Sequence, residues 1–248
     1  MEKITSRKNA YIMRLRALAN DAELRRSEGE YLCDGLKLLE EALHKGAVIR
    51  SVLWKGEAKN IPGLDGAKQY AASEELFDYA SPMKNSPGPV FTVTMPRMNG
   101  ADFNCAVLLE NVQDPGNVGT VIRTAAAMGV KTVILCGACA DVYSPKTARA
   151  TMGAIFSEHI IRMDIDSAAE LIHSRGMKLY GAALSDRAKD IRELELKNAV
   201  VAIGSEGRGL SPQLLGLCDG ELIIPMAPGS ESLNAAVAAS IVLWEMAR

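Results

Sequence analysis

The chain has 248 residues, of which 48% are hydrophobic and 23% charged, with a formal net charge of −2 at pH 7. This composition is typical of a soluble globular protein of one large or two small domains, and it excludes a uniformly basic chain. No apolar run approaches the roughly 18–20 residues that a membrane span requires. The polar N-terminus predicts no signal peptide, so we expect a cytoplasmic protein.

Residues 5–26 are predicted to form a polar helix with a local excess of positive charge. Residues 1–26 contain seven Lys or Arg residues against three acidic ones. A clustered basic surface on a near-neutral protein is typical of a site for a polyanion such as RNA, although a solvated helix face has the same composition.

A small α/β domain is predicted for the first part of the chain. Its predicted elements after the basic helix are a helix over 35–45 with Leu36, Leu39 and Leu43 on one face, a strand over 48–54, and a helix over 73–81 capped by Ser73. The segment 81–104 then contains four prolines and two glycines. We therefore expect a domain over 1–97, a linker over 98–104 and a second domain over 105–248.

The second domain is predicted to be a mostly parallel α/β sheet. Continuous apolar runs separated by helical patterns are typical of buried parallel strands with crossover helices. These runs occur at 105–112, 131–136, 158–163, 177–183, 199–204 and 221–225.

The five cysteines do not predict a disulfide framework or a metal site. Cys136 and Cys139 form a CxxC at the end of an apolar run, but no second pair and no nearby histidine completes a zinc ligand set. We interpret them as packed small residues.

Three segments that follow predicted strands carry polar residues, and ligands of open α/β sheets bind beyond the carboxyl ends of the strands. The first is ENVQDPGNVGTVIRTAAAMGV, where a turn precedes a helix that ends at Gly129. Asn117 is predicted to cap this helix, and Arg123 follows in its second turn among apolar neighbours. Arg123 is either a partly enclosed functional cation or an exposed side chain with a buried stem.

The second segment, GSEGRGL, resembles a phosphate-binding loop only superficially. It is neither Gly-x-Gly-x-x-Gly nor a P-loop, and the carboxylate of Glu206 would repel a phosphate. The loop suits a cationic or hydroxylic ligand, with the glycines allowing a tight fold, or it is a structural turn.

The third segment is IIPMAPGSESLNAAVAASIVLWEMAR, in which a loop leads into the last helix. Ser232 is a predicted N-cap. The helix is apolar almost all round, so we expect it to be buried, in part against another subunit.

Together the three segments resemble the ordered motifs of the SpoU/TrmH family, RNA ribose 2′-O-methyltransferases of the SPOUT superfamily. The resemblance covers residues 105–248, and residues 1–97 are similar to the small substrate-binding domain that often precedes it. DVYSPKTARATMGAIF, residues 141–156, also resembles a family segment with the pattern Asp-x-x-x-x-Lys-x-x-Arg-x-x-x-Gly.

The resemblance implies a fold, a cofactor and an assembly. The family's sheet contains a trefoil knot, its knotted loops bind S-adenosylmethionine, and its members are homodimers with the site near the interface. By position, the cofactor-binding residues are Ala183, Gly204, Ile224, Met226 and Leu233. No metal is implied.

The catalytic positions that the resemblance implies are Asn117, Arg123, Glu206, Ser232 and Asn234. Arginine is a poor base because its pKa exceeds about 12. We therefore expect Arg123 to hold the target phosphate and to stabilise developing alkoxide charge, with Glu206, Ser232 and Asn234 as orienting groups. A deprotonated Arg123 acting as general base is the alternative within the family. Arg208, between glycines, is a further candidate phosphate contact.

The predicted function is methyl transfer to a ribose 2′-hydroxyl of ribosomal RNA. Transfer RNA is the alternative substrate, and a non-catalytic RNA-binding assembly factor that retains the fold is the alternative function. A dinucleotide-dependent oxidoreductase is disfavoured because the strand–Gly-x-Gly-x-x-Gly–helix fingerprint is missing.

Overall fold

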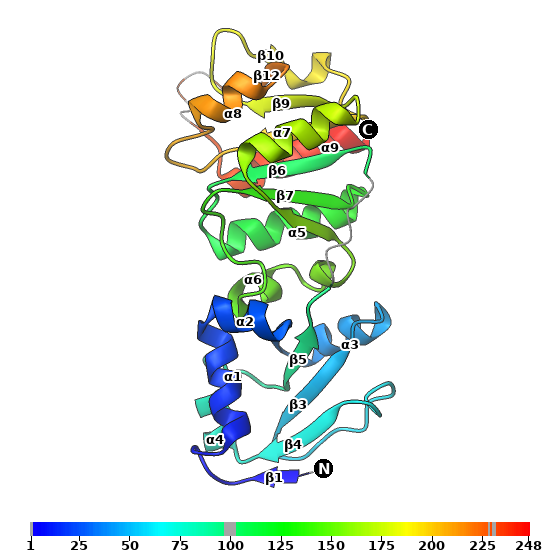
Figure 1. Cartoon of the computed structure of the whole chain (residues 1–248), viewed down its shortest axis with the longest axis vertical. Helices are drawn as coiled ribbons and strands as arrows, with labels where there is room; N and C mark the ends of the chain where they lie inside the picture. Colours follow the sequence, from blue (N-terminus) through cyan, green and yellow to red (C-terminus); the bar gives the residue numbers. More distant parts are fainter. Residues whose placement is uncertain (1, 97–102, 228, 230–231) are drawn as a thin grey trace. The chain divides into compact units, whose positions relative to one another are not determined.

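The computed structural model describes residues 2–96, 103–227, 229 and 232–248, and the chain forms two compact units. The first unit contains Met1–Arg97 and Asp141–Phe156, and the second contains Met98–Ala140 and Ser157–Arg248. The segment 141–156 therefore packs in the first unit although strands of the second unit precede and follow it in the sequence (Figure 1). Most of the predicted linker, residues 98–102, lies outside the described residues.

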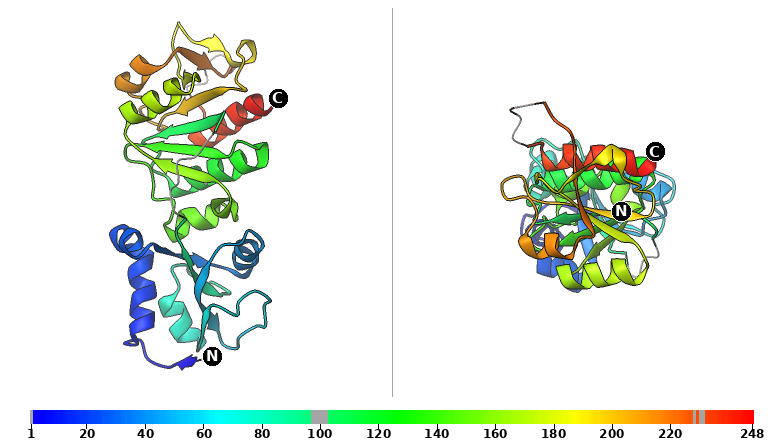
Figure 2. Two further views of the ribbon diagram at one scale, coloured as in Figure 1. Left: turned by 45° about the vertical axis from the view of Figure 1, so that its right-hand side comes forward. Right: turned by 90° about the horizontal axis from the view of Figure 1, so that it is seen from above.

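The first unit contains a five-stranded sheet of order β1-β4-β3-β5-β2. Its strands are β1 (Glu2–Ile4), β2 (Glu30–Asp34), β3 (Ile49–Lys55), β4 (Lys68–Ala72) and β5 (Val90–Thr94). Its helices are α1 (Ala10–Asn20), α2 (Ala22–Glu28), α3 (Leu36–His44), α4 (Glu74–Ala80) and α6 (Pro145–Ala150). The β5 strand runs antiparallel to both of its neighbours, and the other pairings are parallel. Helices α1 and α4 share one apolar cluster with the sheet, and α3 lies on the opposite face (Figures 1 and 2).

Most predicted elements of this unit are confirmed, and two predictions need correction. The helix predicted over 5–26 is two helices, because the carboxylate of Asp21 accepts hydrogen bonds from the N–H groups of Glu23 and Leu24 and so starts α2. Strand β5 lies inside the segment 81–104, for which no strand was predicted. Its sequence, VFTVT, contains two threonines and is flanked by prolines and glycines, so no continuous apolar run marked it.

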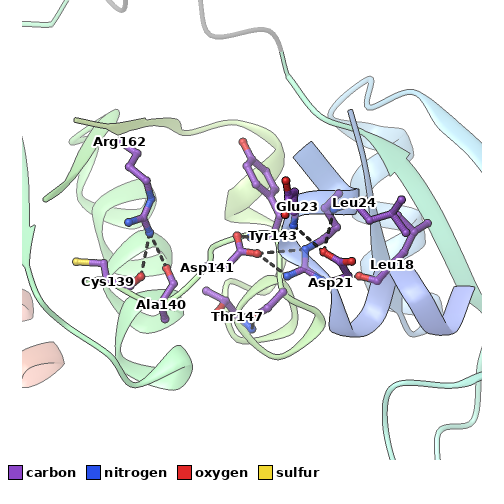
Figure 3. Close-up of polar contacts among 12 residues, drawn as sticks. Leu18, Asp21, Glu23, Leu24, Cys139, Ala140, Asp141, Tyr143, Thr147 and Arg162 are labelled. Atoms are coloured by element: carbon purple, nitrogen blue, oxygen red, sulfur yellow. Dashed lines mark hydrogen bonds and ion pairs between the residues drawn. The ribbon is translucent and has the colours of Figure 1, made fainter. Parts of the chain in front are cut away.

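An ion pair between Arg25 and Asp141 helps to hold the segment 141–156 in the first unit. Arg25 of α2 is 3% exposed, and its Nε donates to Asp141 at 3.1 Å. The same carboxylate accepts from the N–H of Tyr143, so Asp141 both pairs with α2 and folds its own loop (Figure 3). The two residues just before this segment, Cys139 and Ala140, are held by a side chain that follows it. Arg162 donates to their carbonyl oxygens at 2.9 and 3.2 Å (Figure 3).

The second unit confirms the predicted parallel α/β sheet. Seven strands pair in the order β10-β12-β9-β11-β6-β7-β8, and every pairing is parallel. The strands are β6 (Ala106–Glu110), β7 (Thr132–Cys136), β8 (His159–Arg162), β9 (Lys178–Ala182), β10 (Lys189–Asp190), β11 (Ala199–Ile203) and β12 (Gly220–Ile223). The helices are α5 (Pro115–Met128), α7 (Ile165–Ser174), α8 (Pro212–Leu217) and α9 (Ala235–Ala247).

Helices cover both faces of this sheet, which explains why its central strands are apolar throughout. Helices α5 and α9 pack together on one face, and α7 and α8 lie on the other (Figure 2). Because the strands are parallel, their carboxyl ends lie along one edge, where the three polar segments begin. No helix among the described residues is long and apolar enough to cross a membrane.

Candidate active site

A cavity of about 390 Å³ lies at the carboxyl ends of three adjacent strands of the second unit. Ala183 follows β9, Gly204 follows β11 and Ile224 follows β12, and these strands are neighbours in the sheet. The loops after these strands, together with the start of α9, enclose the cavity. All five residues that the family resemblance assigned to the cofactor line it, namely Ala183, Gly204, Ile224, Met226 and Leu233.

The loop after β11 is closed by its own backbone. The N–H of Gly209 donates to the carbonyl oxygen of Ser205 at 2.9 Å, and Gly209 has a φ of +64°, which favours glycine. A Cβ on Gly204 would lie 2.1 Å from the carbonyl carbon of Gly209 and 2.4 Å from the nitrogen of Leu210. Gly204 is therefore required by the close approach of two backbone segments, and the same approach shapes one wall of the cavity.

The buried carboxyl end of β6 is hydrogen-bonded to the residue that directly follows this loop. Glu110 is 1% exposed, and its Oε2 accepts a hydrogen bond from the backbone N–H of Ser211 at 2.7 Å. Glu110 was not predicted as a site residue from the sequence. Its only signal was an acidic residue at the end of an otherwise continuous apolar run, and such a residue needs a buried donor.

Asn117 connects the start of α5 to the Glu206 loop. The cap of α5 is Asp114, whose Oδ1 accepts from the N–H of Asn117 at 2.8 Å, so the prediction that Asn117 caps this helix is wrong. The helix begins at Pro115, which is favoured at the first helical position. The side chain of Asn117 is thereby available, and its Nδ2 donates to Oε1 of Glu206.

Asn234 extends this contact to the last helix. Its Oδ1 accepts from the N–H groups of Ala236 and Val237, so Asn234 rather than Ser232 is the cap of α9, and the predicted capping role of Ser232 is wrong. Its Nδ2 donates to Oδ1 of Asn117 at 3.2 Å. Asn117, Glu206 and Asn234, which come from three distant segments, thus form one hydrogen-bonded chain that we call the polar cluster.

Ser232 and Arg123 differ in their relation to the cavity. Ser232 lines it, as do Glu206 and Arg208. Arg123 lies in the third turn of α5, is exposed, and is not among the residues that line the cavity, so the expected apolar enclosure is wrong. Within the described part of the chain, its guanidinium makes no hydrogen bond or ion pair. The polar cluster therefore joins three of the five predicted catalytic residues and leaves Arg123 apart from them.

The two cysteines of the CxxC are buried parts of the second unit. The thiol of Cys139 donates to the carbonyl oxygens of Leu109 and Cys136 at 3.3 Å. Burial raises the pKa of Cys136 to about 12, so its thiol is protonated at neutral pH. The residues that the structure describes contain no group of three His, Cys, Asp or Glu side chains that could hold a metal ion.

These features define the class of protein to which the second unit belongs. A parallel α/β unit has a cavity at the carboxyl ends of its strands, a glycine-dependent wall and a polar cluster that includes one cavity-lining carboxylate. This is an α/β domain built to bind a small ligand beside reactive polar groups.

The chain belongs to the SpoU rRNA Methylase family, whose model matches residues 104–244, as the motif resemblance predicted. It is 32% identical to the Bacillus subtilis 23S rRNA (guanosine(2553)-2′-O)-methyltransferase RlmP, over 99% of both chains. It is 35% identical to a Thermus thermophilus tRNA (guanosine(18)-2′-O)-methyltransferase over 57% of this chain and 73% of that one.

Solved structures agree with the predicted fold. The SpoU methyltransferase AviRb from Streptomyces viridochromogenes, in complex with the cofactor AdoMet, superimposes with a TM-score of 0.86 at 27% identity, covering 97% of each chain. The similarity therefore extends over both units and not only over the family-matched residues.

Proposed function

We propose that this protein transfers a methyl group from S-adenosylmethionine to a ribose 2′-hydroxyl of RNA, with ribosomal RNA as the substrate. The observation that carries the proposal is the cavity of the second unit with the polar cluster beside it. The choice of ribosomal RNA is supported by the extent of similarity. The relative named for ribosomal RNA matches both units, whereas the relative named for transfer RNA matches 57% of the chain.

The lining of the cavity fits the cofactor. Its volume of about 390 Å³ falls within the range of roughly 300–1,000 Å³ that small-molecule sites occupy. Backbone of the tight loop at Gly204 and of Ile224, together with the side chains of Met226 and Leu233, would hold the adenosine portion. When bound, S-adenosylmethionine supplies an electrophilic methyl group on a sulfonium. The carboxylate of Glu206 on the lining is compatible with that positive charge and not with a phosphate.

The polar cluster would position the nucleophile. Asn117 and Asn234 fix the carboxylate of Glu206, and a fixed carboxylate beside the cavity can accept a hydrogen bond from a ribose hydroxyl. Ser232 supplies a second hydroxyl on the same lining. Arg123 would hold the target phosphate with its guanidinium and stabilise the alkoxide as it forms.

A homodimer would explain the exposed position of Arg123. Val237 and Trp244 of α9 are 48% and 60% exposed and lie seven residues apart, on one face of the helix. They border a hollow of about 450 Å³ between α5 and α9 that is also lined by Thr120. Arg123 follows Thr120 by one helical turn. We propose that a second copy covers this apolar face and that Arg123 acts in a site completed at the interface.

We also propose the role of each domain and the location of the protein in the cell. Residues 105–248 form the methyltransferase domain with the trefoil knot of the superfamily, residues 1–97 form the RNA-binding domain, and residues 98–104 link them. The protein acts in the cytoplasm, needs no metal and has no membrane association.

The test is methyl transfer from labelled S-adenosylmethionine to ribosomal RNA and to transfer RNA, with ribosomal precursor particles as a third substrate. We expect label on ribosomal RNA, at a ribose that becomes resistant to alkaline cleavage. Cofactor binding is measured separately by calorimetry. Binding without transfer to any of the three substrates would overturn the catalytic proposal in favour of an RNA-binding assembly factor.

A further inference from the structure

A second cavity lies wholly within the first unit. Its volume is about 630 Å³, and its lining comes from the end of β2, from α3, from Arg149 of α6 and from the loop residues Lys59, Pro87, Gly88 and Met152. The lining residues with charged side chains are Asp34, Lys37, Glu41, Lys59 and Arg149. Nothing in the predicted chemistry of the second unit uses this cavity.

Three cations line it and remain unpaired. Lys37, Lys59 and Arg149 come from three separate segments and are exposed. Within the described ranges none of their side chains makes a hydrogen bond or an ion pair. Arg149 belongs to the family-like segment 141–156, which Asp141 holds in this unit through Arg25.

The basic N-terminal segment is different, because much of its positive charge is neutralised within the fold. Arg7 pairs with Glu75, Arg14 with Glu28 and Glu30, and Arg25 with Asp141. Three of the seven cations in residues 1–26 are therefore neutralised, whereas Lys3, Lys8, Arg16 and Arg26 form no ion pair among the described residues. The three cations around the cavity differ from these four because they line one common hollow.

The two acidic residues of the lining have partners of their own. Asp34 accepts hydrogen bonds from the hydroxyls of Ser81 and Ser86 at 3.1 and 2.8 Å, and burial raises its pKa. Glu41 pairs with Lys45 one helical turn away, at 3.8 Å. Neither carboxylate forms an ion pair with the three cations, although Arg149 attracts Asp34 from beyond ion-pair distance and partly opposes the rise in its pKa. Three cations against these two partnered carboxylates suit the cavity to an anion.

Backbone donors and apolar side chains complete the lining. Helix α3 has no side-chain cap, and its first intrahelical bond runs from the N–H of Leu39 to the oxygen of Gly35 at 3.1 Å. The N–H groups of Leu36 and Lys37 consequently have no acceptor within the helix. Leu36 also lines the cavity with Pro87 and with Met152, whose side chain is 56% exposed.

We propose that this cavity binds one unpaired nucleotide of the RNA substrate, with its phosphate on Lys37, Lys59 and Arg149 and its base against Leu36, Pro87 and Met152. The inference rests on the RNA-modifying function proposed above. It adds the substrate feature that the first unit recognises. A cavity can admit a base only from a single-stranded or looped region, because bases in a duplex are stacked and paired.

The test measures binding of the full chain to a fluorescently labelled single-stranded RNA oligonucleotide, and to a duplex of the same sequence, by anisotropy. Loss of one neutralised phosphate reduces the slope of log affinity against log salt by about 0.7, which is about fourfold in affinity at 0.15 M salt. The variant Lys37→Ala/Lys59→Ala/Arg149→Ala, which removes all three cations from that one phosphate, should therefore bind single strands about fourfold more weakly, with the slope reduced by about 0.7. Duplex binding should change much less.

The matched control is Lys3→Ala/Lys8→Ala/Arg26→Ala, which removes three cations of the same unit that line no described cavity. It should bind single strands nearly as wild type, and thermal melting should show all variants folded. Equal decreases in affinity for the cavity and control variants, or equal decreases for single strands and duplex, overturn the assignment.

The cavity assignment and the proposed methyl transfer can fail independently of each other. Cofactor binding to the cavity variant, measured by calorimetry, should match wild type. If wild type methylates RNA and the cavity variant does so with unchanged KM, the cavity assignment fails and the function stands. If the cavity variant binds single strands more weakly as expected but wild type transfers no methyl group, the function fails and the cavity assignment stands.

Discussion

The two cavities of this chain differ in what forms them. The cavity of the second unit is shaped mainly by backbone and small or apolar side chains, and a single tight loop at Gly204 defines one wall. The cavity of the first unit carries unpaired cations from three segments. Together, the two proposals predict a division of labour, in which one unit holds a compact cofactor by shape and the other holds a polyanion by charge. Four predictions test this division.

The largest effect is expected from Arg123→Ala. Removal of a group that stabilises charge in the transition state typically costs about 100- to 1,000-fold in rate, so methyl transfer should fall by that factor. Cofactor affinity should stay near that of wild type, because Arg123 does not line the cofactor cavity, and RNA affinity should fall by about fourfold, the contribution of the one phosphate that Arg123 holds. Arg123→Lys keeps the charge and should retain part of the activity. Single-turnover rates with labelled donor measure the effect, and a wild-type rate for Arg123→Ala would remove this residue from the mechanism.

Gly204→Ala should be the next most damaging change. The new Cβ would clash with the backbone at Gly209 and Leu210, and overpacking of this kind costs about 2–3 kcal/mol. Cofactor affinity should fall about 30- to 100-fold by calorimetry, while single-stranded RNA binding remains. Gly207→Ala is the control, since its Cβ would meet no atom within 4 Å. Similar decreases for both variants would show that the loop's glycines act through flexibility rather than through close approach.

Asp141→Asn should weaken the first unit selectively. Arg25 would keep its charge in a buried position, and breaking a partly buried pair costs about 2 kcal/mol. Urea denaturation should show this decrease in stability, and single-stranded RNA binding should weaken because Arg149 lies in the same segment. Glu75→Gln removes the exposed partner of Arg7 and should change stability by about 0.5 kcal/mol or less. A cofactor affinity that fell with Asp141→Asn would contradict the division.

The smallest effect is expected from Trp244→Ala. Truncation of an interface aromatic typically costs about 1–2 kcal/mol, so the dimer should dissociate roughly tenfold more readily in sedimentation equilibrium. Val48→Ala removes an equally exposed apolar side chain of the first unit and should leave the dimer unchanged. A monomeric wild-type chain would refute the proposed interface and, with it, the proposed role of dimerisation for Arg123.

Local sequence patterns predicted six of the seven strands in the second unit's sheet and missed only the two-residue β10. The central strands of this sheet are apolar on both faces because helices cover both sides, so each strand could be recognised from its own residues. Several strands of the first unit were not predicted from the sequence. Strand β5 is short and flanked by prolines and glycines, and β2 and β4 were missed because neither alternation nor a long apolar run marks them.

The helix starts show the same limit on a smaller scale. Asp114, Asn117, Ser232 and Asn234 are all residue types that cap helices. Composition alone could not say which of them caps and which is left for other contacts. Backbone conformation decides this, because only the residue that just precedes the first helical turn can accept from its N–H groups.

Patterns within short segments were enough to predict the family, most of the parallel sheet of the second unit and the residues that line the cofactor cavity. The remaining features became visible only in the folded structure. It joined Asn117, Glu206 and Asn234 from three distant segments, left Arg123 apart from them, and placed segment 141–156 in the first unit. It also neutralised Arg7, Arg14 and Arg25 by ion pairs and left the cavity cations without ion pairs. Charge pairing between distant segments depends on the folded path of the chain, which no local pattern records.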